Sequence, residues 1–375
     1  MNNVVLQIEG LTGGYLFFDG QMQDQQLGLW VAAQAEKQGV VIHQHCPVQA
    51  VSATAALLLQ GESEWRQFDR LVNVAGPWSN QLLEQSGLPV QQSLDLVRGS
   101  HLLLPGWRLP VAQALTFLHR RDRRPVFVFP WEGATVVGTT DLDHQADLDI
   151  SASISGEELD YLLAACAQQF PHAQVVAGDV LSTWSGVRPV VGSSGAQQGQ
   201  PSNETREHVL WQEPGCVTLA GGKLTTFRPQ AIEVLTACAA MLGRELSDDG
   251  APVFAAVEPL PIAGLSASQW RRLAGRHGRD LPRVAQLIEQ LGSDSVGATD
   301  TLWVELALAC DTEMVLHLDD LLLRRTRLGL LLAEGGAQYL PAIRRLCQPR
   351  LGWDDARWAQ AWPTSCRWRR PPRWQ

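Results

Sequence analysis

The segment VTLAGGKLTTFRPQAIEVL, residues 217–235, joins a β-branched, apolar run to a helical pattern through a paired glycine and a lysine. This order predicts a strand, a turn too tight for side chains at Gly221 and Gly222, and a helix whose free N–H groups lie above the strand end. A Walker phosphate loop is excluded, because it needs a glycine where the chain has Val217 and a Ser or Thr where it has Leu224. Two interpretations stay open: an ordinary tight connection, and a site for an anion or an electron-rich ring atom.

The bulk composition limits the class of protein. At 375 residues, the chain is long enough for two or three domains of roughly 100–200 residues each. The hydrophobic fraction of 45% is that of a globular protein, and the net charge of −9 makes general nucleic-acid binding a poor hypothesis. Seven scattered cysteines, with no C-x-x-C pair, indicate a reducing compartment and argue against a structural zinc site.

The sequence also gives an expectation about location. MNNVVLQIEGLTGG at the N-terminus has neither the basic start nor the long apolar run of a secretory signal. No apolar run approaches the roughly 20 residues of a membrane span. We therefore expect a cytoplasmic protein that is soluble or attached at most to a membrane surface.

The N-terminal part predicts strands that alternate with helices. A strand at GGYLFF is followed by a helix over 24–37, a stop at Gly39 and a strand over 40–45. A short hairpin-like pair then precedes a buried strand over 71–74 and a helix from about Ser79. This alternation predicts a parallel sheet covered by helices.

The rest of the chain changes character twice. Short apolar runs separated by Gly, Pro and Asp, such as RPVFVFPW and ATVVGTTD, predict an antiparallel sheet with a helix over 155–170 on it. A strand and a helix return at 217–242, and almost everything from Ser266 to about Trp362 has helical periodicity. The tail TSCRWRRPPRWQ, rich in Arg, Trp and Pro, is expected to be unstructured.

Several short motifs occur in one order along the chain. LVNVAGPWSN, residues 71–80, would bring backbone close to a ligand at the carboxyl edge of a sheet, although by itself it fits a simple tight turn slightly better. VRGSHLLLP, VFVFPW, VVGTTD, SGVRPVV, AGGKLTT and DDLLLRRTRLGL follow it. Together these segments resemble the flavin-dependent glycerol-3-phosphate dehydrogenases, including the related glycerophosphate oxidases, from about Gly13 to Trp362.

The resemblance implies roles for four side chains. His101 matches a catalytic histidine that takes a proton from a substrate hydroxyl, whereas by itself it would be a histidine satisfied at a strand edge. Arg188, also counted as catalytic, and Arg206 match arginines that hold a phosphate, because a rigid fork of donors suits a dianion. Arg206 alone, in its polar loop, would be a solvated charge. Lys223 is expected to add a third cation, so that the 217–235 segment becomes a wall of a flavin and phosphate site.

The resemblance also implies a cofactor, flavin adenine dinucleotide (FAD), and no metal. The positions that it assigns to FAD binding are Val48, Gly76, Gly221, Gly222, Lys223, Leu224 and Thr225.

Three other features receive structural interpretations. The basic HRRDRRP, residues 119–125, fits a solvated turn between strands, in which Asp122 partly offsets four arginines. LLLRRTRLGL, residues 321–330, has apolar residues at helical spacing and belongs in this family to a C-terminal helical cap. Cys216 is expected in the core.

The chain departs from the family in one respect: it contains no G-x-G-x-x-G, since the glycines at 10, 13 and 14 have the wrong spacing. Family members begin with a βαβ unit that carries the flavin pyrophosphate, followed by an Arg-containing loop. The chain is therefore expected to match the C-terminal two-thirds of such an enzyme, to bind little or no FAD alone, and to expose an unpaired sheet edge. A frameshift, a mis-chosen start, and a fragment that pairs with a separate N-terminal chain are all left open.

We therefore predict an α/β protein with an incomplete FAD-binding domain of the Rossmann-like, glutathione-reductase type, an antiparallel-sheet substrate domain and a C-terminal all-α domain. The predicted ranges are 1–85 and 191–245 for the FAD-binding domain, 86–190 for the substrate domain, 255–362 for the helical domain and 363–375 for a disordered tail.

The function implied by the resemblance is oxidation of sn-glycerol 3-phosphate to dihydroxyacetone phosphate, with a hydride passing from C2 to FAD. Electrons would then pass to a membrane quinone, or to oxygen as in the oxidases. Peripheral attachment to the inner face of the cell membrane and a homodimer are left open. One alternative is another amine- or hydroxyacid-oxidising flavoprotein, which the cations Arg188, Arg206 and Lys223 disfavour. The other is a non-enzymatic fragment that binds no flavin.

Overall fold

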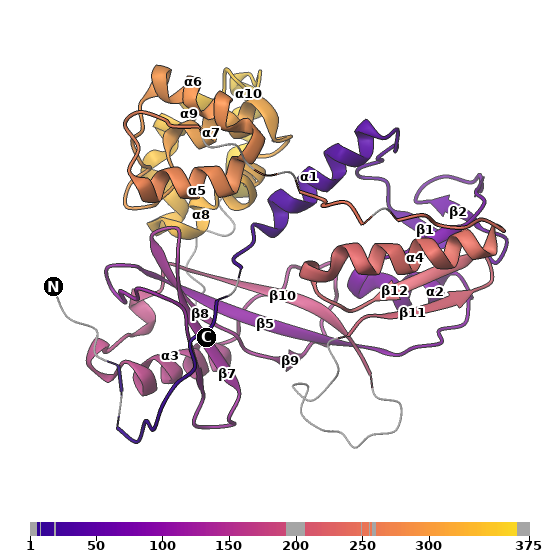
Figure 1. Ribbon diagram of the computed structural model, residues 1–375, viewed down its shortest axis with the longest axis horizontal. Coiled ribbons are helices and arrows are strands. Elements are labelled where there is room, and N and C mark those ends of the chain that lie inside the picture. Colours follow the sequence, from indigo (N-terminus) through magenta and orange to yellow (C-terminus); the bar gives the residue numbers. More distant parts are fainter. Residues whose placement is uncertain are drawn as a thin grey trace.

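The molecule consists of two small sheets with their helices, a large antiparallel sheet and a C-terminal group of helices (Figure 1). The computed structural model describes residues 6–7, 9–18, 20–192, 207–248, 250–254, 256 and 260–365. Of the tail predicted over 363–375, residues 363–365 are instead the end of a helix, Asp355–Ser365, and the rest lies outside the described residues. The mixed α/β class with an antiparallel sheet and a C-terminal helical part is confirmed.

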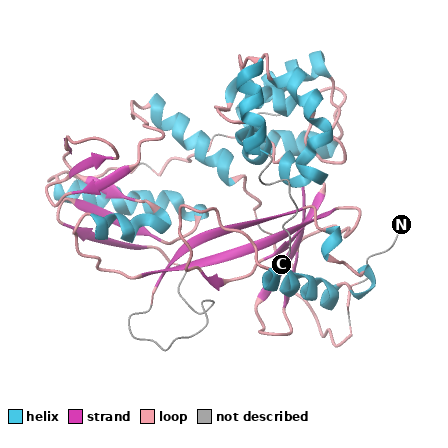
Figure 2. Ribbon diagram, turned by 180° about the vertical axis from the view of Figure 1, so that it is seen from behind, coloured by secondary structure: helices cyan, strands magenta, loops and turns pink. Residues whose placement is uncertain are grey.

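The large sheet has the strand order β10-β5-β8-β7-β6, with β9 paired to β5. Its strands are β5 (Leu94–Pro105), β6 (Leu115–Leu118), β7 (Pro125–Trp131), β8 (Ala134–Gly138), β9 (Leu142–Asp143) and β10 (Ser182–Val191). The pairing of β10 with β5 runs antiparallel from Ser182↔Leu103 to Val191↔Leu94. These two strands are the long ribbons that cross the molecule in Figure 2.

The two faces of this sheet have different covers. On one face, Leu102 and Leu104 of β5 pack with Leu159 and Leu162 of helix α3 (Gly156–Gln169). The short helices η2 (Pro171–Ala173) and η3 (Ala177–Asp179) follow α3. Helix α3 begins where the sequence predicts because Ser155 forms a capping box: its hydroxyl accepts from the N–H of Glu158. On the other face, Leu103 packs toward the C-terminal helices, and this face carries the candidate site.

The two small sheets have separate topologies. Strands β1 (Val48–Val51), β2 (Ala56–Leu59) and β3 (Arg66–Gln67) form an antiparallel sheet, and β4 (Leu71–Asn73), β12 (Cys216–Ala220) and β11 (Val209–Glu213) form a mixed one. The associated helices are α1 (Asp24–Lys37), η1 (Gly76–Trp78), α2 (Ser79–Gln85), η5 (Leu224–Thr226) and α4 (Phe227–Met241). The predicted parallel pairing holds for β4 with β12, and the hairpin-like pair predicted before residue 71 is confirmed as β2 with β3. Strand β1, which was not predicted, pairs antiparallel with β2. Cys216 is buried, as predicted.

Two predicted strands do not form. The GGYLFF segment and residues 40–45 lie outside every strand. Phe18 is 96% exposed and Val41 is 75% exposed. Apolar composition favours a strand, but a strand also needs a partner for its N–H and C=O groups, and no described strand pairs with these segments. One edge of β4 is likewise unpaired among the described strands.

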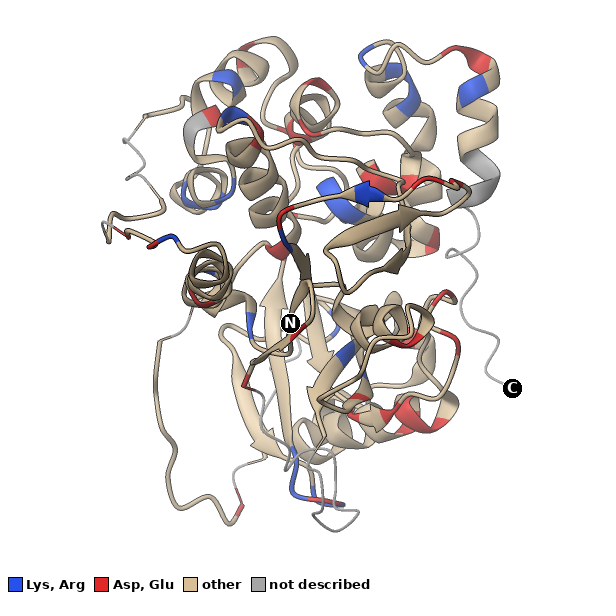
Figure 3. Cartoon of the chain, turned by 90° about the vertical axis from the view of Figure 1, so that its right-hand side faces the viewer, with Lys and Arg blue, Asp and Glu red and all other residues tan. Residues whose placement is uncertain are grey.

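The C-terminal part is helical, as predicted. Its elements are α5 (Ala267–His277), η6 (Gly278–Asp280), α6 (Leu281–Leu291), α7 (Trp303–Thr312), η7 (Asp320–Arg325), α8 (Leu328–Leu331), η8 (Ala333–Tyr339), α9 (Leu340–Cys347) and α10 (Asp355–Ser365). Basic and acidic residues are interspersed over these helices in Figure 3 rather than gathered by sign. None of the helices in the described ranges has the length and apolarity needed to span a bilayer.

A cluster of buried charges fastens the helices to the large sheet. Arg272 of α5 donates from Nε to Glu132, in the β7–β8 turn, at 2.8 Å, and from Nη1 to Glu305 of α7 at 2.7 Å. All three side chains are largely buried, so the turn and the two helices share one guanidinium.

Candidate active site

One face of the β5–β10 pair brings the predicted histidine and one predicted arginine together. His101 lies opposite Trp184, and Gly99 lies opposite Gly186. Arg188 follows two residues further along β10. Because side chains alternate between the faces of a strand, all five positions belong to the same face. Because Gly99 and Gly186 have no side chains, neither strand of the pair places a side chain between His101 and Arg188; the hydroxyl of Thr139 lies over Gly99.

His101 is held by close packing. Its ring stacks on the Trp184 indole, with centroids 4.9 Å apart and planes inclined by 21°. On β8, Gly138 lies opposite His101, and a Cβ at that position would overlap the imidazole ring. Among the described residues, Nδ1 of His101 is buried without a hydrogen-bond partner. The packing therefore fixes the plane of the ring and leaves one ring nitrogen uncommitted.

The environment of His101 also sets its charge. Burial, and then the positive charge of Arg188, lowers the pKa of the imidazole from 6.5 to about 4. A histidine with this pKa is neutral at pH 7. It can therefore accept a proton from a hydroxyl group, as a general base must.

Arg188 is partly exposed and ion-paired. Its side chain is 39% exposed, and its Nη2 donates to Oδ1 of Asp141 at 2.6 Å. Arg206, the second predicted phosphate ligand, lies outside the described residues. Of the two arginines predicted to bind phosphate, Arg188 is therefore the one that the described chain places on this face.

The glycine-lysine loop lies at the end of the neighbouring sheet. Gly221 and Gly222 follow β12 with φ values of +78° and +83°, which is the left-handed region that the predicted tight turn requires. Lys223 is exposed at the start of η5, and no hydrogen bond or ion pair joins its side chain to His101 or Arg188 in the described chain. The turn is confirmed, whereas a part for Lys223 in anion binding stays a prediction.

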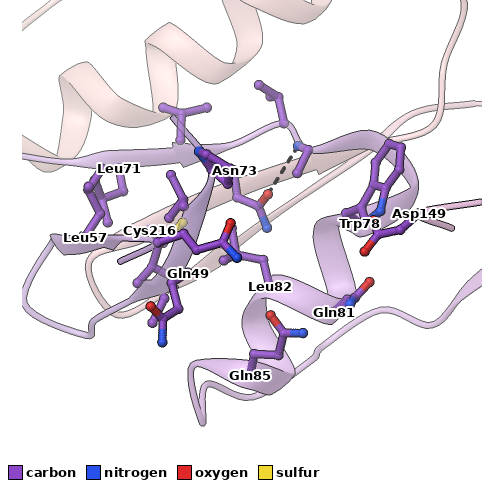
Figure 4. Close-up of a pocket in the computed structure, with 18 residues that line it drawn as sticks. Gln49, Leu57, Leu71, Asn73, Trp78, Gln81, Leu82, Gln85, Asp149 and Cys216 are labelled. Carbon is purple, nitrogen blue, oxygen red and sulfur yellow. Dashed lines mark hydrogen bonds between the residues drawn. The ribbon is translucent and has the colours of Figure 1, made fainter. Parts of the chain in front are cut away.

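The other predicted cofactor positions border a groove of about 950 Å³. It is lined by β1, including Val48, by residues 71–75, and by α2 (Figure 4). Gly76 follows this wall directly, and the amide of Asn73 fixes the turn by accepting from the N–H of Ala75 at 3.3 Å, the dashed line in Figure 4. The volume lies within the roughly 300–1,000 Å³ of cofactor and small-molecule pockets.

The residues present fit part of a dinucleotide. The parallel strands β4 and β12 have their carboxyl ends on the same side of the sheet, so the turn at Gly76 and the turn at Gly221–Gly222 are neighbours there. Strand β10, which carries Arg188, contacts both η1 and β12. Val48, Gly76 and the 221–225 loop would line the path of FAD. In the described part of the chain, no group of three His, Cys, Asp or Glu side chains could hold a metal ion.

The sequence alone did not predict Trp184, Gly138 or Asp141 as site residues, although it identified the VVGTTD and SGVRPVV motifs. Their proximity depends on the strand order β10-β5-β8, which no motif spacing specifies. The basic turn 119–125 is a turn as predicted, but Arg124 is not a solvated charge: it contacts the buried Asp141.

Comparisons with known proteins agree with this architecture. Residues 3–228 match the family described as FAD dependent oxidoreductase, and residues 217–358 match the C-terminal domain of alpha-glycerophosphate oxidase. The chain therefore belongs to the FAD dependent oxidoreductase family.

Similar proteins carry more specific names. An aerobic glycerol-3-phosphate dehydrogenase of Staphylococcus haemolyticus is 29% identical over 85% of this chain, which spans 62% of that relative. An alpha-glycerophosphate oxidase of Streptococcus pyogenes is 26% identical over 93% of this chain and 70% of its own length. The glycerol-3-phosphate dehydrogenase from Bacillus halodurans complexed with FAD has the same fold, with a TM-score of 0.74, 24% identity, and coverage of 98% of this chain and 77% of its own.

Proposed function

We propose that the chain serves the FAD-dependent oxidation of sn-glycerol 3-phosphate to dihydroxyacetone phosphate. The observation that carries the proposal is the placement of a neutral, half-buried His101 and a cationic Arg188 on one sheet face, separated by two facing glycines. The names of the relatives support the choice of substrate.

In this proposal, His101 accepts the proton of the C2 hydroxyl as the C2 hydride leaves. FAD supplies the hydride acceptor when it is bound. Arg188 holds the phosphate, and Val48, Gly76 and the 221–225 loop, including Leu224 and Thr225, hold the cofactor. Arg206 and Lys223 are proposed as further phosphate ligands. Because the imidazole is neutral and Arg188 is not, the site combines a proton acceptor with an anion anchor.

We further propose that the electrons pass to a quinone, and that the protein works in the cytoplasm, in contact with the membrane surface where quinones reside. A homodimer is compatible with this arrangement. Reduction of a short-chain quinone on addition of sn-glycerol 3-phosphate, compared with oxygen consumption, would identify the acceptor.

The test of the proposed function uses the full chain supplied with FAD, and follows acceptor reduction on addition of sn-glycerol 3-phosphate. Arg188→Ala should lower kcat/KM by roughly ten- to hundredfold, mainly through KM, because a charge-assisted contact is worth about 1.5–3 kcal/mol. Arg344→Ala is the matched control, since Arg344 is 42% exposed and pairs with Asp355 at 2.7 Å in the helical domain.

Three results would contradict the proposal. Turnover of amino acids or 2-hydroxy acids in preference to glycerol 3-phosphate would favour another oxidase chemistry. Kinetics that are unchanged in Arg188→Ala would remove this residue from the site. A chain that neither binds FAD nor turns over any substrate would support a non-enzymatic fragment.

A further inference from the structure

The guanidinium of Arg188 forms an ion pair with the buried carboxylate of Asp141. Asp141 follows β8 in the GTTD loop and is 3% exposed. Its Oδ1 accepts from Arg188 at 2.6 Å, and its Oδ2 contacts the guanidinium of Arg124. Arg124 also donates to the backbone carbonyl of Asp141 at 2.8 Å. A single buried carboxylate therefore bridges an arginine on β10 and an arginine at the start of β7.

The loop that carries Asp141 is itself anchored. Thr140 donates from Oγ1 to Glu158 at 2.6 Å and accepts from the N–H of Ser100 at 2.9 Å. Glu158 is buried at the start of α3, where it also accepts from Ser100 Oγ at 2.7 Å. The position of the Asp141 carboxylate is thus fixed by the helix and by two strands. Through it, the flexible Arg188 side chain is restrained before any ligand arrives.

Such restraint matters for binding. A free arginine side chain samples many rotamers, and ordering it beforehand lowers the entropic cost of binding a ligand. A carboxylate beside a phosphate would repel the ligand, but Arg124 supplies a second positive charge. The Arg124, Asp141 and Arg188 group therefore keeps a net charge of about +1 and presents it through Arg188, the more exposed of the two guanidiniums.

We propose that Asp141 is a positioning residue for the anion-binding Arg188, and that Arg124 is the counter-charge that allows a carboxylate to stand there. The inference rests on the proposed function, in which Arg188 binds the phosphate of glycerol 3-phosphate.

The direction in which one substitution changes the affinity for a dianion distinguishes a positioning role of Asp141 from a purely electrostatic one. Asp141→Asn makes the site more positive by one charge, so electrostatics alone would tighten the binding of a dianion. Loss of positioning would weaken it. Asp143→Asn is the matched control, because it makes the same charge change two residues away, on an exposed side chain of β9.

The experiment titrates sn-glycerol 3-phosphate, and inorganic phosphate as a second probe, into the full chain supplied with FAD, by calorimetry. We expect Asp141→Asn to raise the Kd for both ligands by about tenfold, and Asp143→Asn to leave it unchanged or slightly lower. The affinity for FAD should stay close to that of the unaltered chain, which a general structural defect would not allow, whereas the Tm should fall because Arg124 loses its buried partner.

A second variant covers the case in which Asp141→Asn does not fold. Arg124→Gln combined with Asp141→Asn replaces the buried ion pair with two amides and should also raise the Kd. If Arg188→Ala abolishes binding while the Asp141 variants bind as tightly as the unaltered chain or more tightly, the positioning role is overturned and the proposed function stands. If the unaltered chain binds no glycerol 3-phosphate, both are overturned.

Discussion

The imidazole of His101 lies on the indole of Trp184, and Trp184 in turn contacts Trp131, with ring centroids 5.4 Å apart. Arg327 also contacts Trp131, with its guanidinium carbon over the ring and 5.2 Å from the ring centroid. Arg327 belongs to the segment between η7 and α8, so a continuous run of ring contacts joins the proposed proton acceptor to the helical domain. The helical domain therefore helps to limit the access of water to the imidazole of His101.

Trp184→Leu tests this packing. Opening the face of the imidazole to water should raise the pKa of His101 from about 4 toward 6.5, because burial is the larger cause of its low value. The acid limb of the pH profile of kcat/KM, measured on the FAD-supplied chain, should move up by at least about one pH unit. Trp107→Leu, at an exposed tryptophan, should leave the limb in place. An unmoved limb in Trp184→Leu would show that the indole does not set the pKa.

His101→Gln should change how stability depends on pH. The folded pKa is about 4 and the usual value is 6.5, so between these pH values the unfolded chain binds a proton that the folded chain does not. This preferential binding of a proton by the unfolded chain lowers the free energy of unfolding as the pH falls from the usual pKa toward the folded pKa. The variant lacks this effect. The difference in free energy of unfolding between the variant and the unaltered chain should therefore be about 2 kcal/mol more favourable to the variant at pH 5 than at pH 7.5.

Urea unfolding at the two pH values measures this difference, with His172→Gln, at an exposed histidine, as the control. Parallel pH dependences of the His101→Gln variant and the unaltered chain would mean that the imidazole titrates normally.

Gly138→Ala tests the other side of the histidine. The added methyl group would overlap the His101 ring, so the imidazole must leave its position between Gly138 and Trp184. We expect kcat to fall by roughly tenfold or more, since proton transfer requires hydrogen-bond geometry. Gly28→Ala, on the exposed side of α1, is the control, because a Cβ at Gly28 also meets no atom within 4 Å. Equal activity of the two variants would argue against a geometric requirement at His101.

The sequence predicts local secondary structure better than it predicts contacts between segments that are far apart in the chain. Helix α1 has the predicted bounds, 24–37, because its pattern and its stop at Gly39, with φ of +88°, are local signals. The strand predicted over 40–45 fails because a strand depends on a distant partner. His101 and Arg188 were identified through a family resemblance. The Asp141 contact, in contrast, depends on the order of three strands, which no short pattern encodes.

Glu305→Gln should weaken the attachment of the helical domain. Burial pushes the pKa of Glu305 up, but the hydrogen bond with His277 and the charges of Arg272 and Arg276 outweigh it and hold the pKa below its usual range. The carboxylate is therefore ionised, and its stabilising effect is present above its unfolded pKa and lost as the pH falls below it. Removing this charge leaves Arg272 and Arg276 to share the carboxylate of Glu132, so one buried positive charge loses its counter-charge, which typically costs about 3–5 kcal/mol.

Thermal unfolding at pH 7.5 measures this loss, and Glu289→Gln, on the exposed side of α6, is the control. A Tm within about 1 °C of the unaltered chain would show that the cluster contributes little to stability.

The unpaired edge of β4 has a consequence for handling the protein in solution. Val72 and Val74 are exposed on and beside this edge, and an open strand edge is a template for contact between molecules. At neutral pH, the net charge of −9 makes the molecules repel one another. Near the isoelectric point of about 5.5 this repulsion disappears. Colloidal stability should therefore be lowest in mildly acidic buffer of low ionic strength, and storage near pH 8 should keep the protein monodisperse for longest.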